Sequence, residues 1–376
     1  MERVAELLGR DMMSVFQGAI DRLLGRGQAA VTVPPLDGAL KPNNRLEDAT
    51  VALAASAPDN LVSWQGRLVF SSGSRILGVG EPAGDVAAPT IKRPSAITAM
   101  ASSPDGLLAV ATLADGLCVL DRDGQMRRVT TADHAVFGAT TALAFAGEHT
   151  LLACIGSTQH AIAQWSHDLL SGGRSGSLWK IDLRSGAASA IATGLAFPNG
   201  LAMTADGDCI VSESWQHRLL RIAPNGTVRG QVLDDLPGYP GRLVRAEEGY
   251  WLSIFAPRSQ LIEFVLREPA YRQAMMAEVP PELWIAPALS SGNSVLEPMQ
   301  GGALKQMGIL KPWAPSRSYG LVVELNEDFV PVRSLHSRAG GRRHGITSAL
   351  PHGGRLWVTS KGGDQVVALD LAEQGT

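Results

Sequence analysis

The chain has 376 residues, of which 18% are charged and 45% hydrophobic, and this composition excludes a largely disordered protein. Its formal net charge of −3 argues against a nucleic-acid binder, which would carry a basic face. The 41 glycines and 22 prolines indicate many tight turns, so the length favours one large all-β domain. The three widely spaced cysteines, Cys118, Cys154 and Cys209, indicate neither a disulfide framework nor a zinc site, and we expect them to be buried.

The first predicted element is an amphipathic helix, in which apolar residues from Val4 to Leu24 recur near helical spacing. Charged residues interrupt it, so it lacks the uncharged core of a secretory signal, and no stretch approaches the ~20 apolar residues of a membrane span. We therefore expect a cytoplasmic protein with no transmembrane segment. The helix is suited to contact a partner or a membrane surface. With the proline-containing arm that follows, it makes up a predicted N-terminal unit, residues 1–45.

Residues 46–376 contain a repeat that consists of an apolar strand, a turn with glycine, and a second apolar strand ending in small or hydroxyl residues. The six turn glycines are Gly66, Gly106, Gly147, Gly207, Gly249 and Gly354. Glycine accepts the positive φ that a tight hairpin turn requires. A second strand pair follows each of these hairpins, as in GSLWKIDLRSGAASAI. Six such four-stranded units predict an all-β fold, a six-bladed β-propeller.

Two further points concern the arrangement of this predicted propeller. A β-sandwich with long loops is the alternative fold, but a sandwich would not repeat the order of an inner and an outer hairpin six times. The longest interval between turn glycines contains EPAYRQAMMAEVPPELW and a stretch rich in Gly, Pro and Ser. We interpret residues of about 267–318 as a partly helical insertion in the fifth blade that lies over one face.

The stretch from Trp165 to Ile254 resembles the strictosidine-synthase-like proteins, which are relatives of the paraoxonases and the gluconolactonase-type hydrolases. The similarity extends over about residues 57–371, and it is most specific between the FPNG and LPG motifs. The resemblance implies a six-bladed propeller with a site in its central channel. In the hydrolase branches, such a site holds calcium or another divalent ion and opens lactones or aryl esters.

In a propeller the first strand of each blade lines the channel, so equivalent positions of the six repeats converge near the axis. Counting back about seven or eight residues from each turn glycine gives six such stations: Asp59, Thr98 or Ala99, Thr140 or Thr141, Asn199, Gly241 or Arg242, and Ile346 or Thr347. Asp59 and Asn199 match metal ligands of the resembled group. The resemblance therefore implies one divalent cation, calcium first, held by these two residues.

The chain departs from the resembled group at two other ligand positions. Relatives carry an aspartate where this chain has Gly241-Arg242, and an asparagine where it has Thr140-Thr141. Calcium prefers about 6–8 oxygen ligands, so one carboxylate and one amide would hold it weakly, and an inward Arg242 would repel it. Alternatively, the side chains of Asp59 and Asn199 bond to channel water or to each other without a metal.

Several residues are candidates for the chemistry of the channel. His344 precedes the sixth inner strand, and its titration near neutral pH suits a general base. Thr141, Arg242, Thr347 and Trp165 are the candidate substrate-binding residues. Thr347 also stands where strictosidine synthase carries its catalytic glutamate, so that condensation is not expected.

The favoured hypothesis is a hydrolase of the lactonase or arylesterase kind, acting on a small ester or lactone. A divalent ion would polarise the carbonyl, and His344 or a channel carboxylate would deprotonate the attacking water. Apolar side chains such as Trp165, Phe197 and Trp313 are expected to wall the pocket. The alternative is a non-catalytic propeller with a degenerate metal site that binds a ligand or a protein.

Overall fold

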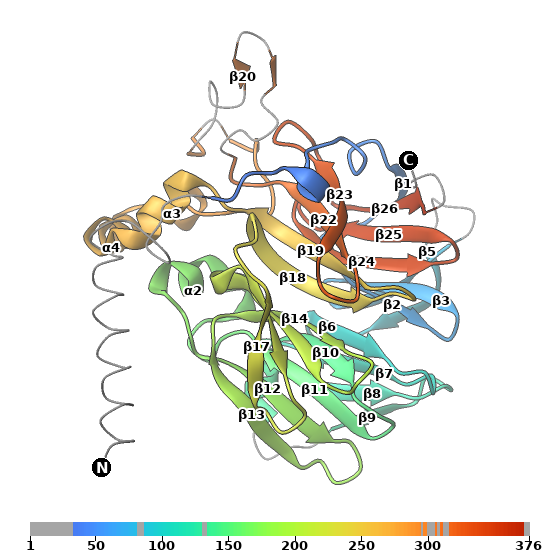
Figure 1. Cartoon of the computed structure of the whole chain (residues 1–376). Helices are drawn as coiled ribbons and strands as arrows, with labels where there is room; N and C mark the ends of the chain where they lie inside the picture. The colour runs from blue at the N-terminus through green and yellow to red at the C-terminus, as the bar shows by residue number, and fades with distance from the viewer. Residues whose placement is uncertain are drawn as a thin grey trace, which may run out of the picture.

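The computed structural model describes residues 33–80, 86–129, 134–294, 296–298, 305–306, 309–310 and 316–371. Within these residues, six four-stranded antiparallel sheets form the blades of a propeller (Figure 1). From the innermost strand outwards, the first three blades are β2 (Pro58–Trp64), β3 (Arg67–Ser72), β4 (Arg75–Val79), β5 (Val86–Lys92); β6 (Ile97–Ser102), β7 (Leu108–Thr112), β8 (Gly116–Leu120), β9 (Met126–Arg128); and β10 (Thr140–Phe145), β11 (Thr150–Ile155), β12 (Gly176–Asp182), β13 (Ala188–Leu195). The last three are β14 (Pro198–Met203), β15 (Cys209–Glu213), β16 (Arg218–Ile222), β17 (Val228–Leu233); β18 (Gly238–Arg245), β19 (Tyr250–Pro257), β22 (Gly320–Leu325), β23 (Pro331–Ser337); and β24 (Ile346–His352), β25 (Arg355–Ser360), β26 (Gln365–Asp370), β1 (Thr50–Ala54).

The repeat seen in the sequence corresponds to the inner hairpin of each blade, so the predicted six-bladed propeller is confirmed. All six turn glycines have positive φ, for example +73° at Gly66 and +75° at Gly354. Each inner strand contacts the inner strands of the two neighbouring blades, which closes the ring around a central channel. The apolar cores lie between adjacent blades, and the three cysteines are buried there as free thiols, as expected.

The sixth blade is completed by a strand from near the N-terminal end of the described residues. Strand β1 pairs antiparallel with β26, with Thr50 opposite Ala368, and so becomes the outermost strand of the sixth blade. The preceding arm contains the short helix η2 (Gly38–Leu40) and is bound to β23, because the main-chain N–H groups of residues 46 and 47 donate to the carbonyl of His336. The predicted N-terminal helix lies outside the described residues.

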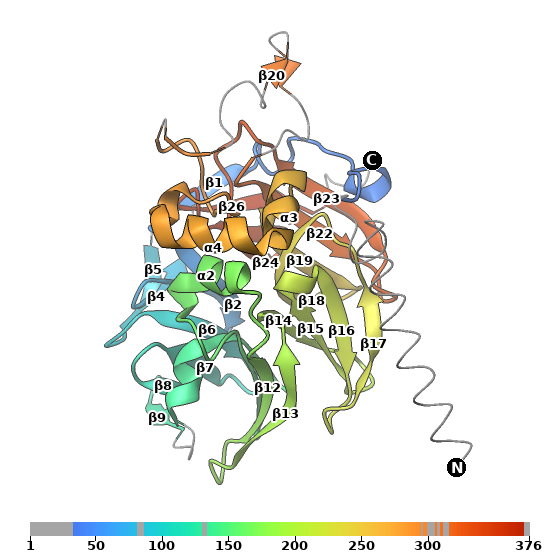
Figure 2. The ribbon, with the colours of Figure 1, turned by 90° about the vertical axis from the view of Figure 1, so that its left-hand side faces the viewer.

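Helices cover one face of the propeller (Figure 2). They are α2 (Trp165–Ser171), α3 (Gln260–Arg267) and α4 (Pro269–Glu278); short 3₁₀ helices are η3 (His134–Ala139), η4 (Ile162–Gln164), η5 (Ser214–Gln216) and η6 (Pro281–Leu283). The insertion of the fifth blade, which also holds β20 (Lys305–Gln306) and β21 (Ile309–Leu310), occupies residues 258–319. The insertion begins before the predicted residue 267, because β19 ends at Pro257 and α3 follows it directly. Ser259 caps α3, and its side chain accepts a hydrogen bond from the main chain of Ile262. Among the described helices, none combines the length and apolar character that a membrane crossing requires.

Buried histidines make the stability of this fold depend on pH. Burial lowers the pKa of His336 to about 4, below the ordinary value of about 6.5. Between these two pH values the unfolded chain binds a proton that the folded chain does not bind. The stability contributed by the neutral ring is therefore present above pH 6.5 and is lost as the pH falls towards 4.

We predict that this one site lowers the free energy of unfolding by about 2 to 3 kcal/mol between pH 7 and pH 4.5. Urea unfolding of the wild type and of His336→Gln at several pH values measures the effect, and the variant should show the flatter dependence. An NMR titration of His336 supplies a second measurement. A pKa near 6.5 in the folded protein would contradict the prediction.

Candidate functional site

The inner strand of each blade breaks register close to the station predicted from the turn glycines, and β18 of the fifth blade has a second break, between Tyr239 and Pro240. The breaks fall between Asp59 and Val62, Ile97 and Ala99, Thr140 and Ala142, Pro198 and Gly200, Pro240 and Leu243, and Ile346 and Ser348. A bulge leaves the main-chain groups of the extra residue outside the ladder. Carbonyl groups at these positions are therefore free to point towards the channel axis.

The guanidinium of Arg242 lies where these freed carbonyls converge. Its Nη1 donates to Asp59 Oδ1 at 2.5 Å and to the carbonyl of Thr347 at 3.3 Å. Its Nη2 donates to the carbonyls of Thr98 at 3.1 Å and Thr141 at 3.3 Å. One side chain from the fifth blade thus bonds to the inner strands of the first, second, third and sixth blades.

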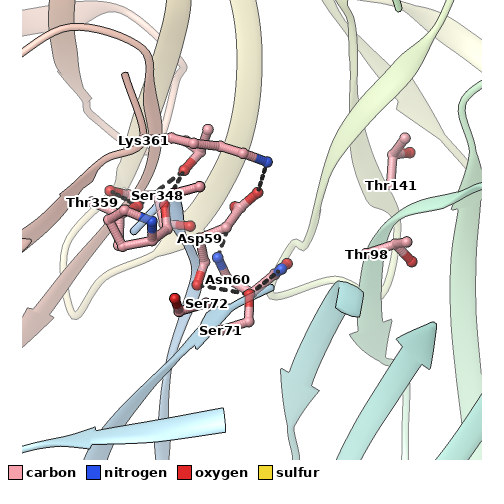
Figure 3. A network of polar contacts seen from close by, with 12 residues as sticks. Asp59, Asn60, Ser71, Ser72, Thr98, Thr141, Ser348, Thr359 and Lys361 are labelled. Atoms are coloured by element: carbon pink, nitrogen blue, oxygen red, sulfur yellow. Dashed lines mark hydrogen bonds and ion pairs between the residues drawn. The ribbon is translucent and has the colours of Figure 1, made fainter. Parts of the chain in front are cut away.

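Asp59 is held between two cations. Its Oδ1 also accepts from the main-chain N–H of Asn60 at 2.7 Å, and its Oδ2 accepts from Lys361 Nζ at 2.9 Å (Figure 3). Burial acts to raise the pKa of Asp59, but the charges of Arg242 and Lys361 outweigh it, and the pKa lies below its ordinary value. Asp59 is therefore an ionised carboxylate whose two oxygens are both committed to donors.

Above this charged floor lies a cavity of about 370 Å³. Its lining residues are Asp59, Ala96, Ile97, Thr98, Leu113, Thr141, Ile162, Ala163, Trp165, Phe197, Asn199, Gly241, Arg242, Phe255, Leu289, Thr347 and Lys361. The lining contributed by η4 and α2 places the cavity under the helix-covered face. The volume is within the usual range for a small-molecule site. The six stations of the sequence analysis do meet at one cavity.

The apolar wall is an aromatic cluster. Trp165 meets Phe255 edge to face, with ring centroids 5.5 Å apart, and Phe197 stacks on Trp215 at 4.5 Å. The indole N–H of Trp215 donates to the buried carboxylate of Asp168 at 2.8 Å, and this hydrogen bond holds the Trp215 ring in place. Trp165 and Phe197 are on the wall as expected, and Trp313 lies outside the described residues. Phe255 is a further wall residue that the sequence pattern did not indicate.

Some polar groups of the cavity are engaged and others are not. The hydroxyl of Thr141 donates to the carbonyl of Pro198 at 2.5 Å, and that of Thr347 bonds to Thr359 at 3.1 Å. The hydroxyl oxygen of Thr98 is buried without a partner. Within the part of the chain that the structure describes, the side-chain amide of Asn199 also makes no hydrogen bond. Lys361, a residue that the sequence analysis did not single out, bonds with Asp59 and is one-third exposed.

His344, the candidate general base, is not among the residues that line the cavity. The residue is 3% exposed, with Nδ1 2.7 Å from the hydroxyl of Ser318 and Nε2 donating to the carbonyl of Arg338 at 3.0 Å. Burial lowers its pKa. Both ring nitrogens are engaged, and His344 links Ser318, at the end of the insertion, to the segment that precedes the sixth blade.

The donor set does not fit the divalent cation that the resemblance implies. Both oxygens of Asp59 bond to cationic groups, and Arg242 holds a fixed positive charge among the carbonyls that a metal would need. Asn199 remains as a neutral ligand. Among the described residues, no group of three His, Cys, Asp or Glu side chains is placed to hold a metal ion.

The ion pair on the axis gives a prediction for stability. Asp59→Asn removes the charge that compensates a guanidinium exposed by only 15%, and breaking such a buried pair costs about 3 kcal/mol. Lys361→Met, which removes the more exposed partner, should cost at most about 1 kcal/mol. Urea unfolding of the two variants at pH 7 compares them. Equal losses of unfolding free energy in the two variants would contradict the prediction that the pair with Arg242 is the stronger one.

Comparison with known proteins gives partial sequence similarity to one family and a shared fold. Residues 147–225 match the strictosidine synthase family. The chain is 23% identical over 216 residues to the adipocyte plasma membrane-associated protein of Salmo salar, which covers 55% of this chain and 45% of the relative. It is 32% identical over 108 residues to Protein STRICTOSIDINE SYNTHASE-LIKE 13 of Arabidopsis thaliana, covering 28% and 27%. The chain thus spans less than half the length of these curated relatives.

A solved structure of a candidate gluconolactonase has the same fold. The two structures superpose with a TM-score of 0.52 at 13% sequence identity, over 85% of this chain and 89% of the other. At this identity the likeness concerns the propeller architecture alone.

Proposed function

For this chain, a strictosidine-synthase-like six-bladed propeller by its sequence matches and its fold, we propose that the channel cavity binds a small molecule with an apolar acyl or aryl body and one carboxylate. The charge of the cavity carries the proposal. Its charged lining groups are Asp59, Arg242 and Lys361, so one negative and two positive charges leave a net charge of +1. A ligand carboxylate would neutralise this surplus.

Lys361 is the group suited to receive the ligand. An ammonium has three N–H donors, and one of them is directed at Asp59. Arg242, in contrast, directs both terminal nitrogens at protein oxygens. The unpartnered amide of Asn199 offers a further hydrogen bond, while the aromatic wall buries the apolar body.

Lactone or aryl-ester hydrolysis, the activity expected from the resemblance, has less support. Its ester carbonyl would also accept from Lys361, but a neutral ester leaves the positive surplus unmatched. Water activation needs a base with a pKa near the working pH. His344 is outside the cavity, and the lowered pKa of Asp59 makes its carboxylate a weak base. The geometry therefore supports binding better than hydrolysis.

Isothermal titration with 4-phenylbutanoate and its neutral isostere 4-phenylbutanamide tests the proposed charge recognition. We expect the carboxylate to bind more tightly, and Lys361→Met to weaken it at least about tenfold with little effect on the amide, since a lost charged contact costs about 1.4 kcal/mol or more. Lys180→Met, which removes an exposed lysine of β12, is the matched control. Equal affinities for acid and amide would refute the proposal.

A panel of aryl esters and lactones, assayed with and without chelator, separates binding from hydrolysis. The expected result is no turnover that depends on the cavity. Turnover that is lost in Asn199→Ala or on chelation would instead establish the hydrolase.

A further inference from the structure

We propose that Arg242 serves as an internal cation at the hub of the propeller, taking the place of a divalent metal ion and making the fold independent of metal. The four oxygens that accept its hydrogen bonds are one carboxylate and three main-chain carbonyls, from Asp59, Thr98, Thr141 and Thr347. These are the oxygen types that calcium binds in proteins. Here each accepts an N–H of the guanidinium instead.

The fourth and fifth blades hold the Arg242 segment in place. The bulge between Pro240 and Leu243 provides the slack that brings Arg242 inwards. The hydroxyl of Ser212 donates to the carbonyl of Gly241 at 2.8 Å, and that of Ser214 donates to the carbonyl of Pro240 at 2.7 Å. Through these bonds the fourth blade fixes the main chain of the arginine, so all six blades take part in the hub.

Close approach of the main chain supports the same conclusion. A Cβ at Gly200 would lie 2.1 Å from the carbonyl oxygen of Gly241, so no larger residue fits beside the arginine segment. The main chains at Gly200 and Gly241 are therefore in direct contact. A planar guanidinium with five N–H donors can satisfy several acceptors in a rigid geometry, which a lysine ammonium cannot reproduce.

This inference is independent of the ligand proposed above, because it concerns the floor of the cavity and predicts a latent metal site. Removing the guanidinium leaves the carboxylate of Asp59, one oxygen of which still bonds to Lys361, together with the carbonyl oxygens and the unengaged amide of Asn199. Such a set should bind Ca²⁺ with a dissociation constant of about 1 mM, at the weak end of protein calcium sites.

The experiment compares thermal unfolding and Tb³⁺ luminescence titrations of the full chain. The wild type should melt at the same temperature with EDTA or with millimolar CaCl₂. Arg242→Ala should melt at a lower temperature, and millimolar CaCl₂ or guanidinium should raise it again. In the double variant Arg242→Ala/Asp59→Asn, ion affinity should fall at least about tenfold, because the single carboxylate is lost.

Arg245→Ala is the matched control. Arg245 lies on the same strand, but it pairs with Glu327 at the exposed end of the blade. Its removal should lower the melting temperature slightly, without rescue by Ca²⁺ or guanidinium.

Three results would overturn the inference. The first is a wild type that EDTA destabilises. The second is a folded Arg242→Ala variant that neither ion rescues. Should Arg242→Ala fail to fold, Arg242→Lys keeps a cation at the hub and is expected to fold with a lowered, calcium-insensitive melting temperature. A calcium-dependent Arg242→Lys is the third contrary result.

Discussion

The ion pair between Arg242 and Asp59 satisfies main-chain carbonyls that the propeller leaves without strand partners at its axis. Each inner strand bulges at the axis, which turns carbonyl oxygens into a narrow space where they have no ladder partner. A buried acceptor without a donor costs about 1–3 kcal/mol. The guanidinium satisfies three such carbonyls, and Asp59 compensates its charge. The hub is therefore a single electrostatic unit made from distant parts of the chain.

The ion pair of Arg242 and Asp59 also determines which charge of the cavity is left without a counter-charge. Because Arg242 neutralises Asp59, the ammonium of Lys361 is left as the uncompensated charge beside the ligand space. The aromatic wall lowers the local dielectric constant, which strengthens the attraction of that charge for an anion. Trp215, anchored by Asp168, keeps the wall rigid. The proposed recognition of an anion thus depends on the charged floor, the aromatic wall and the partly exposed ammonium of Lys361.

Much of this architecture could be predicted because a propeller turns a period in sequence into convergence in space. The turn glycines identified the blades, and counting from them located Asp59, Arg242 and Thr347 at the channel. The closing role of β1 could not be predicted, since its apolar pattern does not say which blade it joins. Lys361 directly follows β25, the second strand of its blade, so the count from the turn glycines to the inner strands does not reach it. His344 is close in sequence to the sixth station, but its ring turns to Ser318, an orientation that side-chain type alone does not reveal.

The departures of the channel sequence from the resembled group have a common physical meaning. Gly241-Arg242 removes an acidic ligand and adds a positive charge, so the balance between Asp59 and a cation is kept although the cation is now covalent. The missing ligands alone would indicate a decayed metal site, whereas the kept charge balance supports the proposed replacement of the metal by Arg242. Asn199 is not among the hydrogen-bond partners of Arg242, which bonds to strands of other blades. Its amide lines the cavity as a neutral group, beside a floor in which Arg242 supplies the positive charge opposite Asp59.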